Sequence, residues 1–189
     1  MLHFMQDIYY AEKLGVRFMA KLARGVDNKG LKDTIFAHRE QSQRQSERLD
    51  QVFKALGKRA KGKTSAAING LAEEGEEAVE EFDKGPVLDA ALIACGQAIE
   101  HYEIARYGAM VAWAKQLGLT EAANLLQQTL DEEKANDGLL NDIAERVLNP
   151  AASKEESDED DDDGEKDEGE GIDKSDEPNG EGKKERAKK

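Results

Sequence analysis

Apolar residues recur at spacings of three and four along the first 148 positions of the chain. This period is typical of amphipathic helices, and no stretch alternates between apolar and polar residues as a half-buried strand does. The pattern therefore predicts an all-α protein. The expected helices cover residues 2–25, 31–57, 65–83, 86–117 and 120–148.

Residues that favour turns separate these helices. The breaks lie at Asn28 and Gly30, at the run GKRAKGK (57–63), at Lys84–Gly85–Pro86 and at Gly118. Thr120 is the expected N-cap of the last helix. The short helix over 65–83 falls between the second and third long helices. Four long helices with such a connection in the middle predict a four-helix bundle with a crossover.

The composition changes after Asn149–Pro150. The run SDEDDDDGEKDEGEGIDKSDEPNGEG holds one large apolar residue, Ile172, so it cannot bury enough surface to offset the entropy of ordering. We expect a helical domain over 1–149 and a disordered acidic tail over 150–189, which ends in the basic run KKERAKK. A solvating role is expected for this tail, and binding of a protein partner or of cations is the alternative.

Much of the formal net charge of −14 lies in this tail. From Ala151 onward there are 17 acidic and 8 basic residues, and the remaining 24 acidic and 19 basic residues give the first 150 positions a net charge of −5. A nucleic-acid partner is not expected, because phosphate backbones require a basic face. No apolar run approaches the ~20 residues of a membrane span. The N-terminal MLHFMQDIYYAEK lacks the pattern of a signal peptide, and one cysteine, Cys95, allows no intrachain disulfide, so we expect a cytoplasmic protein.

Each long helix carries polar residues at the middle of its predicted inward face, between apolar ends. If the four helices pack together, these polar residues meet at one level of the bundle. Several carboxylates in such a place cannot all ionise without cations, and the predicted inward faces contain no Arg or Lys. The candidate metal ligands are Glu12, His38, Glu100, Glu103, Glu133 and Asp137.

Two metal ions would balance these charges, as they do in di-iron and di-manganese carboxylate bundles. Iron is the favoured metal and manganese the alternative. A hydrogen-bonded network in which some carboxylates are protonated is the competing interpretation. Simpler roles are predicted for the flanking side chains. His101 is expected to pack or to support a ligand, and Tyr9 and Tyr107 are expected in the core. Arg48 is expected on a solvated face or in an ion pair.

Four segments resemble the bacterial YciE/YciF-like family, which is also known as a domain of unknown function. They are MQDIYYAEK, HREQSQRQSERLDQVFKALG, GPVLDAALIACGQAIEHYEIARYG and LGLTEAANLLQQTLDEEKANDGLL, within about residues 1–148. The resemblance implies a ferritin-like, rubrerythrin-type bundle with an additional helix, which forms dimers and is linked to stress responses. It implies a metal centre but no particular reaction.

The resemblance to rubrerythrins also implies roles for individual residues. Glu12 matches the single glutamate of the first helix, Glu100 and Glu103 match a Glu-x-x-Glu pair, and Glu133 matches the glutamate of the last helix. Asp137, four residues further on, stands where rubrerythrins have histidine.

The second helix departs from the rubrerythrin pattern of Glu-x-x-His. It offers His38, which the apolar stripe places inward, or Glu40, which the stripe places outward. We favour His38, and Glu40 stays open as the alternative.

These observations lead to one leading function and two others. The leading hypothesis is a cytoplasmic stress-response protein with a dinuclear metal site that handles iron or peroxide. The sequence predicts no catalytic residue and does not decide whether the chain is an enzyme. The alternative is a metal-free structural or interaction bundle whose tail binds partners, and an iron-storage cage is a weaker third. A homodimer is expected because aromatic residues occupy predicted outer faces: Phe4, Phe18, Phe53 and Trp113.

Overall fold

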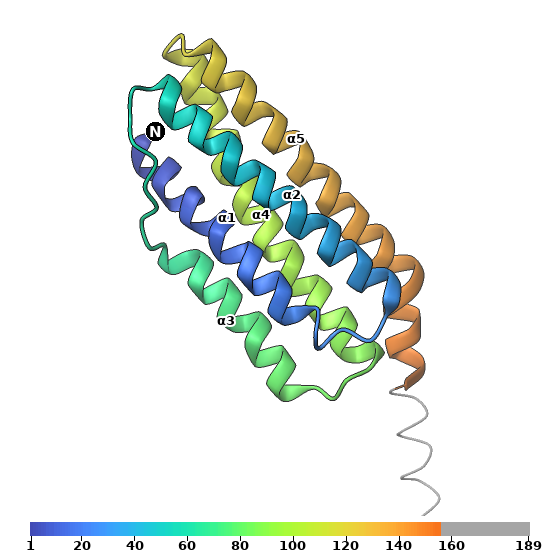
Figure 1. Cartoon of the computed structure of the whole chain (residues 1–189). Coiled ribbons are helices and arrows are strands. Elements are labelled where there is room, and N and C mark those ends of the chain that lie inside the picture. The colour runs from blue at the N-terminus through green and yellow to red at the C-terminus, as the bar shows by residue number, and fades with distance from the viewer. Residues whose placement is uncertain (156–189) are drawn as a thin grey trace, which may run out of the picture.

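The computed structural model describes residues 1–155, and these form an all-α bundle without strands (Figure 1). All five predicted helices are present, and their ends differ from the prediction by a few residues, apart from the last. The helices are α1 (Leu2–Leu22), α2 (Lys29–Ala55), α3 (Ala66–Glu81), α4 (Pro86–Gln116) and α5 (Thr120–Ile143), followed by the π-helical turn η1 (Ala144–Leu148).

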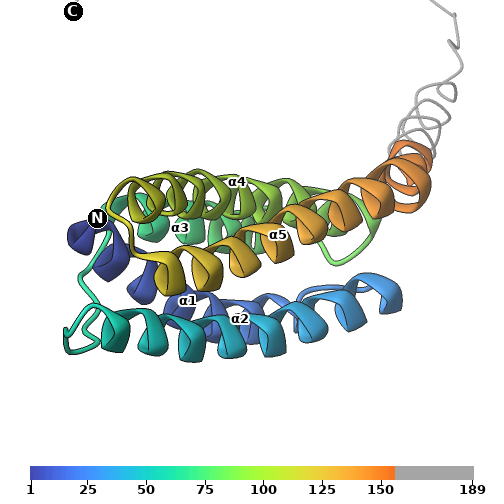
Figure 2. The same ribbon diagram turned by 90° about the horizontal axis from the view of Figure 1, so that it is seen from above.

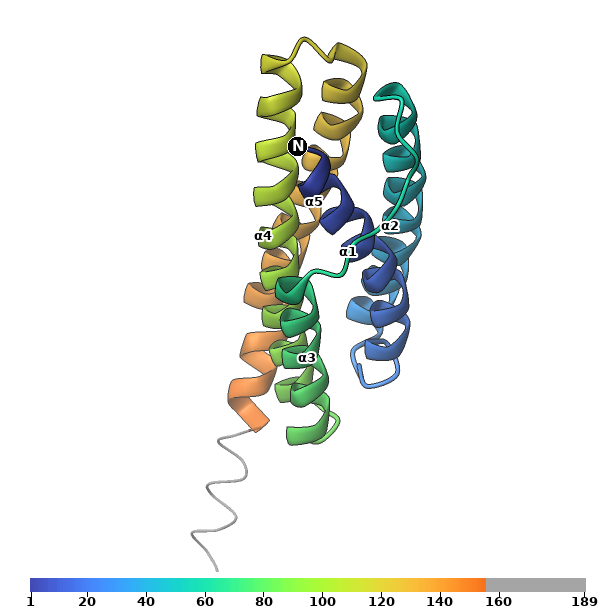
Figure 3. The same ribbon diagram turned by 90° about the vertical axis from the view of Figure 1, so that its left-hand side faces the viewer.

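Helices α1, α2, α4 and α5 form the bundle, and α3 lies outside it against α1 and α4 (Figures 1 and 2). Each of the pairs α1–α2 and α4–α5 is antiparallel, whereas α2 and α4 run in the same direction. Joining two parallel helices requires a long crossover, and α3 is part of it. The segment that leaves α2 passes over α1, where the amide of Lys63 donates to the carbonyl of Gln6 at 3.0 Å (Figure 3).

Local sequence explains where the helices begin and end. Asn28 caps α2, because its side chain accepts a hydrogen bond of 3.0 Å from the amide of Leu31. Gly57 and Gly118 follow α2 and α4 with φ of 64° and 68°, a left-handed conformation that favours glycine. The prediction of Thr120 as an N-cap is wrong, because Thr120 is the first residue of α5. Leu119 is the N-cap, and no side chain caps this end of the helix.

The last helix extends beyond its predicted end at residue 148. After η1 the chain is helical again to residue 155, so the first residues of the predicted tail belong to the helix. The π-helical turn lies just before Pro150, which has no N–H to donate in a regular α-helix. Glu155 then reaches the start of α4, where its Oε2 lies 3.4 Å from the amide nitrogen of Val87. The remainder of the predicted tail, residues 156–189, lies outside the described residues.

Two hydrophobic cores occupy the two ends of the bundle. The first core, beside the α4–α5 loop, includes Met5, Ile8, Val52, Phe53, Met110 and Leu126. The second core, beside the α1–α2 loop, includes Phe18, Leu22, Leu31, Leu88, Leu92, Ile93 and Leu140. Buried polar residues lie between them: Glu12, Ser42, Gln45, Glu100, Glu103, Thr129 and Glu133.

The cores correct two of the predicted surface aromatics. Phe18 and Phe53 are buried, because α3 covers Phe18 and the ring of Tyr9 packs edge-on against Phe53. Phe4 is half-buried, and Trp113 keeps 37% of its surface exposed. No helix among residues 1–155 combines the length and the apolar character that crossing a bilayer requires.

Candidate metal centre

Four glutamates from three helices meet in the polar layer between the two cores. Glu12 comes from α1, Glu100 and Glu103 from α4, and Glu133 from α5, and none is more than 4% exposed. The spacing of three between Glu100 and Glu103 places both on one face of α4. The predicted inward positions of these four residues therefore agree with where the structure places them.

Glu133 belongs to two overlapping groups of ligand atoms. In one group it lies with Glu12 and Glu103, and in the other with His38 and Glu100. Within each group, one ligand atom per residue lies within 4.8 Å of the others. Two cations could therefore occupy neighbouring positions and share the carboxylate of Glu133.

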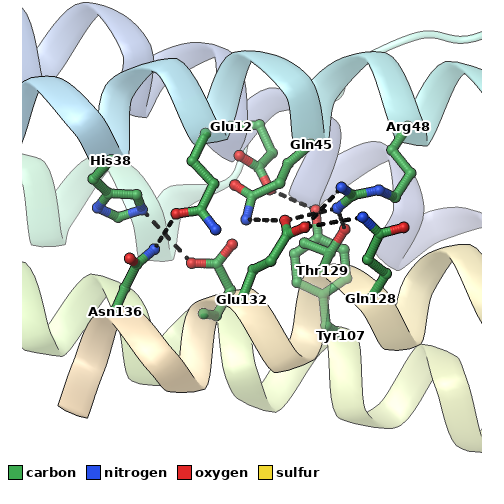
Figure 4. Close-up of polar contacts among 11 residues, drawn as sticks. Glu12, His38, Gln45, Arg48, Tyr107, Gln128, Thr129, Glu132 and Asn136 are labelled. Carbon is green, nitrogen blue, oxygen red and sulfur yellow. Dashed lines mark hydrogen bonds and ion pairs between the residues drawn. The ribbon is translucent and has the colours of Figure 1, made fainter. Parts of the chain in front are cut away.

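His38 provides the contribution of α2. Its Nδ1 lies 3.1 Å from Glu100 Oε1, and its Nε2 lies 3.6 Å from Glu133 Oε2. Figure 4 shows its ring directed into the polar layer between α2 and α5. Glu40, the alternative on this helix, is exposed and does not join either group.

Tyr107 and Glu12 form the shortest link in the layer. The hydroxyl of Tyr107 donates to Glu12 Oε1 at 2.5 Å, and both side chains are buried. Tyr107 is thus a core residue, as predicted, and it also orients a candidate ligand. Groups that hydrogen-bond to metal ligands commonly fix their orientation in this way.

Burial and mutual repulsion govern the charges of these residues. Burial, reinforced by the nearby Glu133, raises the pKa of both Glu12 and Glu100 well above the ordinary value. Burial together with Glu12 raises the pKa of Glu103 in the same direction. Burial and the adjacent Glu12 also raise the pKa of the Tyr107 hydroxyl. In the absence of cations, the layer therefore favours protonated carboxyl groups.

Several polar atoms in the layer have no hydrogen-bond partner among residues 1–155. Buried acceptors without partners are rare and cost stability, so each one calls for an explanation. Most of them belong to the two groups defined above, which fits a site for cations. The atoms are Oε2 of Glu12, Oε2 of Glu100, both carboxylate oxygens of Glu133, Nε2 of His38 and Oε1 of Gln45.

A second polar network lies beside the glutamates and involves Arg48, which is not on the predicted inward face of its helix. Arg48 forms a forked pair with Glu132, with two N–O distances of 2.8 Å, and donates to Thr129 Oγ1 at 2.6 Å (Figure 4). Gln45 and Gln128 also donate to Glu132. Although partial burial opposes it, hydrogen bonds from Arg48 and Gln128 hold the pKa of Glu132 below its ordinary value. Because Glu132 already balances Arg48, this cation leaves the four central glutamates largely uncompensated.

The structure does not bring Asp137 into the cluster. Its carboxylate accepts from Gln97 at 3.2 Å and lies 3.5 Å from the exposed ring of His101. Asn136, one position earlier, faces α2 instead and donates to Gln41 at 3.0 Å. His101 is thus a neighbour of Asp137. Asn136, which donates to Gln41, lies beside His38 (Figure 4).

The family described as Domain of unknown function (DUF892) matches residues 1–153. The chain belongs to this family. Protein YciF of Escherichia coli (strain K12) is 45% identical over 152 residues, which cover 80% of this chain and 92% of YciF.

Solved structures of the family have the same fold. The crystal structure of the E. coli stress protein YciF matches with a TM-score of 0.74 and 45% identity, covering 78% of this chain and 93% of YciF. The Rhodopseudomonas palustris protein YcfI, described as a proposed structural protein, matches with a TM-score of 0.72 and 47% identity, covering 74% and 89% of the two chains. The resemblance inferred from the four sequence segments is thereby confirmed.

Proposed function

We propose that this chain is a cytoplasmic, ferritin-like stress-response protein that holds two metal ions in the layer between its two cores. The observation that carries the proposal is the sharing of Glu133 between two groups of buried ligand atoms. The stress role rests on the relative from E. coli, which is described as a stress protein.

The chemistry of the donors supports iron or manganese. Four carboxylates and one imidazole form a set of oxygen and nitrogen ligands without thiolate, and such ligands suit iron and manganese in carboxylate bundles. Glu12 and Glu103 would hold one ion, His38 and Glu100 the other, and Glu133 would bridge them. The four carboxylates carry as many negative charges as two divalent cations carry positive ones, so binding would remove the repulsion within the layer.

The surrounding residues would position the ligands. Tyr107 fixes Glu12 through its hydrogen bond of 2.5 Å. The carboxylate of Glu100 contacts the imidazole of His38, with 3.1 Å between Oε1 and Nδ1. Iron held in this way would supply redox chemistry toward oxygen or peroxide. The two cores above and below the layer exclude bulk water from it.

Metal analysis tests this proposal directly. Protein purified without chelator, or loaded anaerobically with Fe(II) or Mn(II), should contain about two ions per chain. Glu133→Gln should reduce this content strongly, because both ions lose a ligand. Glu40→Gln is the matched control, because it changes an exposed glutamate of α2 and should leave the content unchanged. A wild-type protein that takes up no metal under either condition contradicts the proposal.

The alternative function is a metal-free structural or interaction protein. The description of the R. palustris relative favours it, and the raised pKa values of Glu12, Glu100 and Glu103 would let protonated carboxyl groups share hydrogen bonds. Absence of metal together with an unchanged fold would support this function.

We also propose a homodimer. Large apolar residues stay exposed on the described part of the chain, including Phe36, Trp113 and Leu117 at 45%, 37% and 63%. Burial of such residues against a second copy would remove apolar surface from water. Light scattering at micromolar concentration should give twice the mass of the chain, and a monomeric mass would exclude the dimer.

A further inference from the structure

A narrow cavity of about 60 Å³ lies in the second core and ends at the candidate metal centre. One end is lined by the polar residues His38, Glu100 and Glu103. The other end, toward the α1–α2 loop, is lined by Leu22, Leu31 and Leu92. From Leu92 to Glu103 the lining extends over about 16 Å at 1.5 Å per residue of helix. The cavity is therefore long for its volume and leads along the bundle axis to the His38 side of the layer.

The walls away from the glutamates offer few polar groups. Thr34 is one, and its hydroxyl already donates to the carbonyl of Gly30 on its own helix at 3.0 Å. A water molecule needs two to four polar partners, so this part of the cavity suits an apolar occupant. The volume also limits size, because an apolar cavity that binds benzene measures about 150 Å³. The occupant must be a molecule of only a few atoms.

Two glycines in the middle of their helices leave this space open. A Cβ on Gly15 would meet Met19 Cε at 3.7 Å, and one on Gly96 would meet Leu140 Cδ1 at 3.6 Å, both ordinary contacts. Alanine would therefore fit at both positions and would favour the helix more than glycine does. Gly75 differs, because a Cβ there would lie 2.7 Å from Phe18 Cζ. Packing thus requires a glycine at Gly75 but at neither Gly15 nor Gly96, where its effect is to keep the cavity.

We propose that this cavity binds a small apolar molecule, with dioxygen as its natural occupant, and delivers it to the His38–Glu100 side of the metal centre. The delivery role rests on the proposed function, whereas the binding of apolar gas does not. Dioxygen is apolar and close to water in size, so it fits both the volume and the walls. Hydrogen peroxide would lose its hydrogen bonds along the same walls and is disfavoured as a user of this route.

Xenon binding to the metal-free protein tests the cavity without reference to the metal. Xenon is an apolar probe for such spaces. Wild-type protein should bind xenon, which ¹²⁹Xe NMR and the methyl shifts of Ile93 and Leu140 would detect. The double variant Gly15→Ala/Gly96→Ala should bind xenon at least several-fold more weakly, and its melting temperature should not be lower. Gly108→Ala is the matched control on α4, because a Cβ there meets no atom within 4 Å among the described residues.

Dissolved dioxygen provides the second measurement. It should enhance the relaxation of the Ile93 and Leu140 methyl groups, which line the cavity, more than that of Val52 and Met110, which belong to the first core. The double variant should lose this difference. Equal xenon binding and equal relaxation in wild type and double variant would overturn the proposal. Metal content, measured on the same proteins, distinguishes the cavity hypothesis from the proposed function. If the protein binds metal but no gas, only the cavity hypothesis is wrong. If it binds gas but no metal, the delivery role and the proposed function are wrong.

Discussion

Tyr107 on α4 and Glu12 on α1 are joined by a hydrogen bond of 2.5 Å in a place that solvent does not reach. The tyrosine hydroxyl occupies one oxygen of the glutamate and leaves the other, Oε2, without a partner among the described residues. The contact thus selects which carboxylate oxygen is available to a cation. It also ties α1 to α4 across the bundle.

Replacing Tyr107 by phenylalanine should therefore loosen Glu12. We expect Tyr107→Phe to weaken metal binding by roughly 10–100-fold, the usual effect of removing a hydrogen bond to a ligand. Titration calorimetry under anaerobic conditions measures this. Tyr102→Phe is the control, because its hydroxyl lies 3.0 Å from Ser65 Oγ, away from the cluster. Equal losses in the two variants would mean that Tyr107 acts only through general stability.

Glu100→Gln should stabilise the metal-free protein. Burial and repulsion by Glu133 both disfavour a charged carboxylate at Glu100, and an amide of the same shape cannot ionise, so the free energy of unfolding at neutral pH should rise. Metal should raise the melting temperature of the wild type much more than that of the variant, which lacks a ligand. Thermal melts with chelator and with Mn(II) measure both effects, with Glu40→Gln as the control. A variant that is less stable in chelator, with no response to metal in either protein, indicates a metal-free network.

The stability of the metal-free protein should depend on pH in a defined direction. The pKa values of Glu12, Glu100 and Glu103 are raised in the fold above the ordinary 4.5, so the folded state binds protons that the unfolded state releases. Their contribution to stability is fully present below 4.5 and is lost as the pH rises through the raised values. Urea unfolding in chelator should therefore show stability falling as the pH rises above 4.5, less steeply in Glu103→Gln. The pKa of Glu132 is lowered, so its contribution to stability is instead lost as the pH falls, and this happens below pH 4.5.

Saturating metal should abolish this pH dependence or reverse it. Cations compete with protons for the same carboxylates, so metal binding releases protons and strengthens as the pH rises. A slope in chelator that is identical in wild type and Glu103→Gln would show that the central glutamates do not cause it.

Periodicity was sufficient to locate the central glutamates but not their neighbours. A helix turns by about 100° per residue, so Asp137 lies about 40° to one side of Glu133 and Asn136 about 60° to the other. Both positions border the same stripe, and only the packing of α5 against α4 and α2 decides that Asp137 meets Gln97 while Asn136 meets Gln41. The spacing alone could not separate them.

Long side chains and the crossover limited the prediction in other places. Arg48 was predicted to lie on a solvated face or in an ion pair, and the structure shows the ion pair, because its flexible stem carries the guanidinium inward to Glu132. The pattern of α1 predicts an exposed Phe18, because the repeat of one helix does not reveal that the crossover helix α3 covers this ring. Such contacts depend on tertiary arrangement, which a single helix pattern does not contain.

The Arg48–Glu132 pair should contribute measurably to stability. With 12% and 24% of the side chains exposed and a forked geometry, we expect a coupling energy of about 1–3 kcal/mol in a double-mutant cycle of Arg48→Met and Glu132→Gln. Urea unfolding measures it. The exposed pair of Lys29 and Asp33 is the comparison and should give a much smaller coupling. Equal couplings would mean that burial adds nothing to this pair.

The end of the last helix sets where the folded unit can be shortened. A chain that ends at Glu155 should unfold at the same temperature as the full chain, because the sequence beyond it holds one large apolar residue, Ile172. A chain that ends at Val147 should lose about 2 kcal/mol or more, because it lacks Leu148, which is 2% exposed in the second core. Circular dichroism melts of the two chains measure the difference. A lower melting temperature for the chain ending at Glu155 would show that residues 156–189 contribute to the stability of the bundle.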